Sequence, residues 1–197
     1  MNLIAAIILV LTMSIPAYEF TEQDVYDLGD AGWLENGHTA GVGTETNRKV
    51  LIMTDVVVLN RREMVTNKWY HLKGEKTVYD VIMAKGQYAS KTRTKLRNTD
   101  TPQEVYDLAR EILTYGTTVP DYIVYQGQNP NLGTLWCPPI AGEYFATYKG
   151  HYMEGEGWEI DTNKKKYEEA QRIVRDFFYT TVIKPLCDSV ERWYVYG

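Results

Sequence analysis

The pattern of apolar and polar positions predicts helices in the first half of the chain. A loose apolar stripe follows Thr21, which can cap a helix that runs to Glu35 and stops at Gly37. Residues 47–62 are apolar nearly all round, a pattern typical of a central, buried helix. The β-branched residues at 56–58 leave a buried strand as the alternative, although the length of the run favours a helix.

Two further helix starts carry capping residues. Thr77 precedes a short apolar run that predicts a helix over residues 78–84. At the other start Thr101 can cap, Pro102 takes the first helical position and Glu104 completes a capping box. The apolar stripe that follows predicts a helix with one buried face, ended by a glycine.

Polar segments separate these helices. Residues 63–76 have a mixed composition that predicts irregular structure. Residues 91–99 are basic and polar, which predicts a solvated surface loop. A loop that lines an anionic polymer is the alternative for this basic segment.

The pattern changes in the second half of the chain, where short runs with strand character appear. Residues 122–125 and 143–148 predict two short strands, and residues 151–153 predict a third. A loop rich in proline, glycine and asparagine separates the first two strands.

A long helix is predicted near the C-terminus. Asp161 or Thr162 can cap it, and its apolar stripe continues to about Tyr179. A last short helix is expected over residues 186–193.

Composition narrows the class of protein. A chain of 197 residues that is 44% hydrophobic is long enough for one globular domain with a core. The net charge of -5 argues against nucleic acid as the main partner. The 16 tyrosines and five tryptophans can stack on sugar rings, or they can simply occupy strands and half-buried surfaces.

The apolar run at residues 3–15 bears on the compartment. It is short for a membrane span and has the length of a signal-peptide core, with cleavage expected after Ala17. The first two residues carry no Lys or Arg, so a retained anchor and a buried first helix stay open as alternatives.

The cysteines and histidines predict no metal centre. Cys137 and Cys187 can form one disulfide in an exported protein or stay as two buried thiols, and the sequence leaves both open. Neither lies in a CxxC motif, and the three histidines form no HExxH motif.

Several short blocks occur in a recognisable order between residues 33 and 148. They are Glu35-Asn36-Gly37, Val56-Val57-Val58-Leu59-Asn60-Arg61, Thr77-Val78-Tyr79-Asp80-Val81-Ile82, Gly86-Gln87-Tyr88, Val119-Pro120-Asp121, Tyr125-Gln126-Gly127-Gln128 and Ile140-Ala141-Gly142-Glu143-Tyr144-Phe145. This order resembles the cell-wall hydrolase family of the spore-cortex-lytic enzymes and their phage relatives. Asn60-Arg61 and Gly86-Gln87-Tyr88, taken in order and with their spacing, carry most of the resemblance.

The resemblance implies an α+β fold, a mainly helical, lysozyme-like domain with a small antiparallel sheet. It implies cleavage of the glycan strand of peptidoglycan by a lytic-transglycosylase or muramidase reaction, with no metal or cofactor. Glu35 is the catalytic residue implied, as general acid and then as general base. One carboxyl is sufficient when the sugar's own 6-hydroxyl closes an anhydro ring. A raised pKa would be needed at that carboxyl, and the apolar neighbours Trp33 and Leu34 are consistent with such a setting.

Other residues in the blocks are candidates for substrate binding, namely Gln87, Tyr88, Tyr125, Gln126 and Glu143. For each of them, holding a loop or strand in place is the structural alternative. Asn60 and Arg61 are expected to tie loops to the end of their helix rather than to contact substrate.

The chain departs from the family pattern in two places. The distance in sequence from Glu35 to Asn60 is long for the family, so Glu45 is a rival for the role of the acid. Many relatives have a histidine at the position of Glu143, so a role carried by that histidine is in doubt here. Glu143 is instead a candidate for a second acid.

The resulting prediction has three segments: a signal peptide or apolar N-terminal segment at 1–17, a cell-wall hydrolase domain at 18–155 and a C-terminal helical extension at 156–197. The protein is expected to be monomeric, secreted or wall-associated, and without stable membrane insertion. A non-catalytic wall-binding protein, or a phage or spore structural protein, is the alternative. A third reading, a partner protein that docks through residues 161–179, requires an exposed apolar stripe there.

Overall fold

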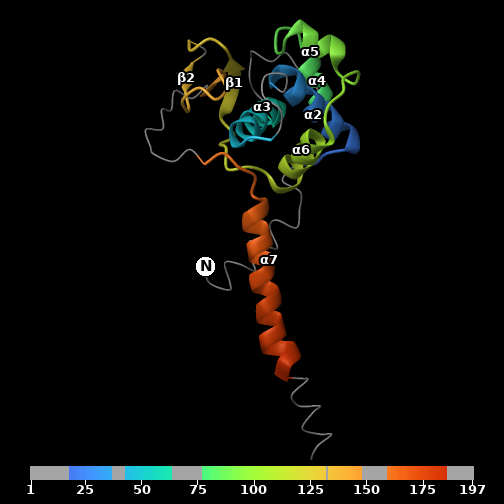
Figure 1. Ribbon diagram of the computed structural model, residues 1–197, viewed down its shortest axis with the longest axis vertical. Coiled ribbons are helices and arrows are strands. Elements are labelled where there is room, and N and C mark those ends of the chain that lie inside the picture. The colour runs from blue at the N-terminus through green and yellow to red at the C-terminus, as the bar shows by residue number, and fades with distance from the viewer. Residues whose placement is uncertain (1–17, 37–42, 64–76, 132, 148–158, 186–197) are drawn as a thin grey trace, which may run out of the picture.

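The computed structural model describes residues 18–36, 43–63, 77–131, 133–147 and 159–185, and it has an α+β fold. The described helices are α2 (Glu22–Asn36), α3 (Glu45–Glu63), α4 (Val78–Met83), α5 (Ser90–Lys95), α6 (Gln103–Tyr115) and α7 (Lys164–Phe178), and a π-helical turn (Tyr179–Ile183) continues α7. The strands are β1 (Ile123–Gly127), β2 (Thr134–Leu135) and β3 (Tyr144–Thr147). The helices other than α7 and the small sheet gather into one body (Figure 1).

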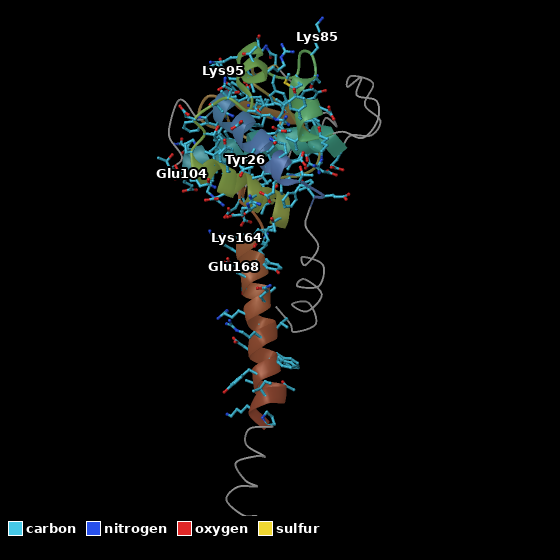
Figure 2. The ribbon with its side chains drawn as sticks, turned by 90° about the vertical axis from the view of Figure 1, so that its right-hand side faces the viewer. Tyr26, Lys85, Lys95, Glu104, Lys164 and Glu168 are labelled. Carbon is cyan, nitrogen blue, oxygen red and sulfur yellow. The ribbon has the colours of Figure 1, made fainter. Side chains whose placement is uncertain are left out.

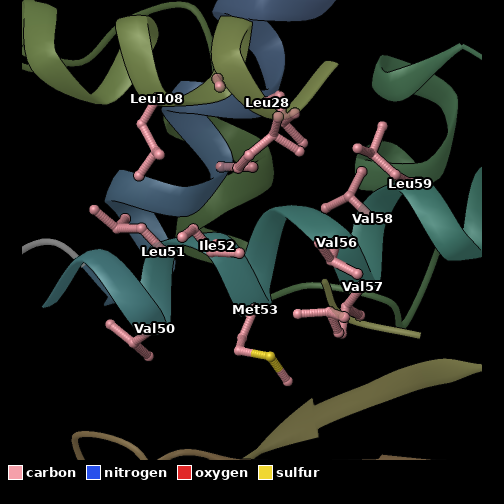
Figure 3. Packing of buried hydrophobic residues seen from close by; sticks show 14 of the residues in the cluster. Leu28, Val50, Leu51, Ile52, Met53, Val56, Val57, Val58, Leu59 and Leu108 are labelled. Carbon is pink, nitrogen blue, oxygen red and sulfur yellow. The ribbon is translucent and has the colours of Figure 1, made fainter. Parts of the chain in front are cut away.

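Helix α3 is the centre of this body. Its side chains from Val50 to Arg61 are all buried. Figure 3 shows Leu28 of α2 and Leu108 of α6 on one side of α3, while Met53 points to the other side, where a strand passes. The prediction of a central, buried helix is confirmed, and the strand alternative for residues 56–58 is wrong. A helix that is apolar all round is stable only when other elements cover every face, as they do here.

The sheet is antiparallel, with strand order β1-β3-β2. The predicted strands at 122–125 and 143–148 are confirmed with small shifts in their ends, whereas β2 lies in a segment predicted as loop. Two residues are too few to show an alternating pattern. Gly133, just before β2, has a φ of 151°, and a Cβ there would lie 3.3 Å from the carbonyl oxygen of Thr147. Only glycine allows so close an approach to β3.

The two predicted helix caps have different outcomes. At α4 Thr77 caps the helix as predicted, because its side chain accepts from the backbone of Asp80. The Asp80 side chain also accepts from the backbone of Thr77, which completes a capping box. At α6 the prediction is wrong, because Pro102 is the N-cap residue and no side chain caps the helix. The hydroxyl of Thr101 donates instead to Asp30 Oδ1 at 2.7 Å. A tertiary hydrogen bond to a buried carboxylate has replaced the local one.

The prediction of a loop over residues 91–99 is also wrong in part, because Ser90–Lys95 forms helix α5. Arg97, which follows it, donates two hydrogen bonds of 2.6 Å to the buried carboxylate of Asp27 on α2. The Arg97 backbone N–H donates to Asp30 Oδ2 at 2.9 Å. The basic segment is thus anchored to α2 by charge-assisted hydrogen bonds, which are stronger than neutral ones.

Helix α7 projects away from the body in both overall views (Figures 1 and 2). Its base is held by Arg48, which contacts Glu111 at 2.7 Å and Asp161 at 3.2 Å. Asn163 is the N-cap residue and makes no side-chain cap, so the prediction of capping by Asp161 or Thr162 is wrong. Among the described helices, including α7, none combines the length and apolar character needed to cross a membrane.

Several predictions concern segments outside the described residues. They are the N-terminal segment at 1–17, the irregular segment at 63–76 apart from its first residue, the strand at 151–153, the boundary at 155 and the helix at 186–193.

One buried carboxyl in α3 lacks a partner. Asp55 is 1% exposed, and neither of its oxygens has a hydrogen bond to the described residues. A Cβ on Gly32 of α2 would lie 2.6 Å from Asp55 Oδ1, so the glycine makes room for the carboxyl. Burial raises the pKa of Asp55 well above its ordinary value because it disfavours the charged form.

This carboxyl predicts a stability that falls with rising pH. The folded state keeps the Asp55 proton at pH values where the unfolded chain, with a pKa of about 3.9, releases it, so the free energy of unfolding declines above that pH. We expect Asp55→Asn to match the wild type near pH 4 and to be more stable by about 1–3 kcal/mol near pH 8. Urea unfolding at both pH values measures this. The exposed Asp100→Asn is the control, and a variant that is less stable than wild type at pH 8 would contradict the prediction.

Candidate functional site

Glu35 lies in the last turn of α2 and is half-buried. Its Oε1 accepts a hydrogen bond from the backbone N–H of Ala89 at 3.3 Å and another from the hydroxyl of Thr92. Leu34 beside it is buried and Trp33 is half-buried. Both donors use Oε1, and among the described residues these are the hydrogen bonds that Glu35 accepts from other parts of the chain. One carboxylate oxygen is therefore fixed by the protein, and the other is available for a reactant.

Glu143 follows a tight turn that leads into β3. Ile140 and Glu143 exchange backbone hydrogen bonds of 2.9 and 3.0 Å, and Ala141 and Gly142 between them have φ values of 52° and 85°. Positive φ at both central positions is the geometry of a type I′ turn. Ala141 is a non-glycine residue in this region, which costs roughly 1 kcal/mol. The turn holds the half-buried Glu143 at the start of the strand.

The pKa of Glu143 is raised by its surroundings. Burial is the main cause, the Gln128 side chain opposes it by hydrogen bonding, and the charge of Glu35 raises the pKa further. The charge of Glu35 therefore acts on a carboxyl that is 108 positions away in the sequence. Two interacting carboxyls in a partly desolvated setting are typical of acid–base catalysis, and structural networks can also produce them.

Asn60 and Arg61 fasten the surrounding loops to the end of α3. Asn60 Nδ2 donates to the carbonyls of Pro120 and Ile123 at 3.0 and 2.8 Å. Arg61 Nε donates to the carbonyl of Val124 at 2.8 Å. The prediction that this pair ties loops to its helix is confirmed.

Arg61 also organises the Gln87-Tyr88 segment. Its Nη1 donates to the Gln87 carbonyl at 3.3 Å, and its guanidinium lies 5.0 Å from the centre of the Tyr88 ring. Tyr88 is only 8% exposed, so its ring supports the segment from within. The Gln87 side chain is half-exposed and remains a candidate for substrate contact. Arg61 thereby links β1 to the segment that continues into Ala89 and the Glu35 contact.

Tyr125 and Gln126 are neighbours on β1 and face opposite sides of the sheet, because side chains alternate along a strand. Gln126 pairs with Phe145, whose side chain is in the core, while Tyr125 pairs with Ala146. Gln126 Oε1 is buried and has no hydrogen-bond partner among the described residues. It is therefore an acceptor available to a donor group.

Glu45 lies in the first turn of α3, and its side chain is 80% exposed. It pairs with Lys49 at 2.6 Å, and the hydrogen bond from Lys49 lowers the pKa of Glu45. This is the setting of a surface carboxylate. Glu35 differs from it in being half-buried and in accepting hydrogen bonds from Ala89 and Thr92.

Two polar residues of this site did not stand out in the sequence. Thr92 lies in the segment predicted as a loop, and only the folding of α5 brings its hydroxyl to Glu35. Gln128 belongs to a block of the resemblance, but its interaction with Glu143 depends on how β1 and the turn before β3 meet.

Neither a metal site nor a disulfide is seen in the described part of the chain. No group of three or more His, Cys, Asp or Glu residues there could hold a metal ion. Cys137 is a free, buried thiol, and burial raises its pKa to about 11. A thiol with this pKa stays protonated and unreactive near neutral pH.

Exposed apolar side chains gather at the C-terminal end of α7 and on its continuation. Phe177, Phe178, Tyr179 and Ile183 are all exposed, the first two by 40% and 54%. Ala170 is the one residue of α7 whose side chain is described as buried.

Comparison of the chain with protein-family models, with curated proteins and with solved structures found no match. The residues around Glu35 come from three separate parts of the chain, namely the end of α2, the start of α5 and the turn before β3. Their chemistry is the basis for assigning a function.

The role of Asn60 predicts a stability effect. We expect Asn60→Ala to lower the free energy of unfolding by about 2–4 kcal/mol, because it removes the buried side-chain donor to the carbonyls of Pro120 and Ile123. Urea unfolding measures the loss. The exposed Asn98→Ala should change stability by less than about 0.5 kcal/mol, and an equal effect of the two substitutions would refute the assigned role.

Proposed function

We propose that this protein cleaves the glycan strand of peptidoglycan, by a lytic-transglycosylase or muramidase reaction, with Glu35 as a catalytic carboxyl. The observation that carries the proposal is the setting of Glu35. It is half-buried, its Oε1 is fixed by Ala89 and Thr92, and its charge raises the pKa of Glu143. The order of sequence blocks that resembles the cell-wall hydrolases supports the same residue.

The chemistry requires two proton transfers. The glycosidic oxygen takes up a proton as its bond to the anomeric carbon breaks, and the attacking hydroxyl loses one as the new bond forms. The attacking group is the sugar's own 6-hydroxyl in lytic cleavage or a water molecule in hydrolysis. A carboxyl held at one oxygen, with the other directed to the substrate, has the geometry for either transfer.

Three half-buried residues, Gln87, Tyr125 and Gln126, are proposed to bind the sugar chain. Gln87 lies on the segment that leads to Ala89, and Tyr125 and Gln126 lie on β1. Gln126 Oε1 is a buried acceptor that a sugar hydroxyl can satisfy. Tyr88 contributes by supporting Arg61 and the loop rather than as an open stacking surface.

Export to the wall and a monomeric state belong to the proposal. Export rests on the apolar run at residues 3–15, and peptidoglycan is the partner that the proposed reaction implies. No cofactor takes part, since both proton transfers use carboxyl groups of the chain.

Glu35→Gln tests the assignment because glutamine keeps the shape of the side chain but carries no transferable proton. We expect it to reduce the release of soluble muropeptides from purified peptidoglycan by about 100-fold or more. Glu45→Gln, a change to the exposed carboxyl paired with Lys49, should retain wild-type activity. Mass analysis of the products distinguishes anhydro ends, which lytic cleavage leaves, from reducing ends, which hydrolysis leaves.

The results of these assays distinguish the proposed role of Glu35 from its alternatives. A fully active Glu35→Gln protein would rule out Glu35, and loss of activity in Glu45→Gln alone would transfer the role to that residue. A wild-type protein that sediments with peptidoglycan but releases nothing would favour the non-catalytic wall-binding alternative.

A further inference from the structure

We infer that the C-terminal end of α7 binds the surface of an anionic lipid bilayer. The residues that enter the bilayer surface are Phe177, Phe178, Tyr179 and Ile183, here called the aromatic end of α7, and nearby basic side chains contact the lipid phosphates. The helix projects away from the body that carries Glu35 (Figures 1 and 2), so this surface is separate from the candidate site. The inference does not depend on the proposed function.

The first support is the apolar surface of the aromatic end. Its four residues are exposed by 37% to 57%. Successive residues of a helix point in directions about 100° apart, so Phe177, Phe178 and Tyr179 together surround most of the helix. Exposed apolar groups that gather in one place indicate an interaction site. Aromatic side chains in particular are enriched where a protein meets the headgroup region of a bilayer.

The second support is charge. Residues 164–184 contain six Lys or Arg residues and three Asp or Glu residues, a net charge of +3, although the whole chain has a net charge of -5. Arg175 and Lys184 lie on either side of the aromatic end in the sequence, and both are exposed. Arg175 is 3.8 Å from Asp176, but both side chains are mostly exposed, so the pair is weak. Each basic residue near an anionic membrane strengthens binding roughly fivefold.

Together these observations favour a bilayer over two other occupants. A second copy of the chain would bring two positively charged segments together, and helix–helix packing would cover only one side of each aromatic end. An anionic wall polymer would pair with the basic residues but has no apolar interior for Phe177 and Phe178. The boundary between lipid headgroups and acyl chains surrounds apolar side chains and places phosphates beside the basic ones.

Sedimentation of the full chain with phospholipid vesicles tests the inference. We expect the wild type to bind vesicles of phosphatidylglycerol and phosphatidylcholine about tenfold more tightly than vesicles of phosphatidylcholine alone. Replacing both phenylalanines, Phe177→Ser with Phe178→Ser, should weaken binding to the anionic vesicles about tenfold or more, because two apolar rings are lost from the interface. Removing two charges, Arg175→Gln with Lys184→Gln, should weaken it about tenfold.

The body of the protein offers matched controls for both changes. Tyr26→Ser removes an aromatic side chain of α2 that is 45% exposed. Lys91→Gln with Lys95→Gln removes two exposed charges from α5, and Figure 2 shows Lys95 at the far end of the body from α7. Both control proteins should bind the anionic vesicles as the wild type does.

Hydrogen exchange measured by mass spectrometry gives the local result. Anionic vesicles should slow the exchange of backbone amides in residues 177–183 of the wild type. Unchanged exchange there, or unchanged binding in both double variants, overturns the inference and assigns any membrane binding to another part of the chain. Dimerisation that the two Phe→Ser changes abolish, without vesicle binding, overturns it in favour of a second copy. Sedimentation with peptidoglycan but not with vesicles overturns it in favour of a wall polymer.

Discussion

The structure depends on the burial of α3 from Val50 to Arg61. A helix with valine, leucine, isoleucine and methionine on every face cannot remain exposed to water, since each such side chain gains roughly 1.5–3 kcal/mol on burial. Helices α2 and α6 and strand β1 therefore pack around it. At the end of α3, Asn60 and Arg61 hold the backbone of β1 and of the Gln87 segment. These hydrogen bonds hold segments that contribute residues to the candidate site.

Polar side chains, rather than the apolar core, position the loops. Asp27 and Asp30 of α2 hold Arg97 and Thr101 on either side of the segment between α5 and α6, just as Arg61 holds the segment before α5. Buried ionic hydrogen bonds of this kind are directional, so they specify where a loop lies in a way that apolar contact does not. In consequence α5 is pinned at both ends, and Thr92 within it is held against Glu35.

Burial raises the pKa of two carboxyls, Asp55 and Glu143, which lie in different surroundings. Asp55 is enclosed between α3 and Gly32 of α2, with no partner for either oxygen, and it reduces stability as pH rises. Glu143 is only half-buried, is affected by the charge of a second carboxylate and lies just before β3, the middle strand of the sheet. The same physical cause, desolvation, therefore raises the pKa of a carboxyl in the core and of one at the candidate site.

The sequence by itself determined the central helix, the start of α4, the two longer strands and the α+β class, because these follow from periodicity and from local capping over neighbouring residues. The ends of α2 and α3 and the tying role of Asn60 and Arg61 were also predictable. Only the tertiary structure decided that Thr101 serves Asp30 and not its own helix, that residues 90–95 form a helix, and that β2 exists at all. The same holds for the site. Sequence order singled out Glu35 but left Glu45 as its rival, and the contacts of Thr92, Gln128 and Glu143 exist only where distant segments meet. Interactions between neighbouring residues determine where helices and strands form. The pKa of a carboxyl depends instead on burial and on neighbours that the chain brings together only on folding.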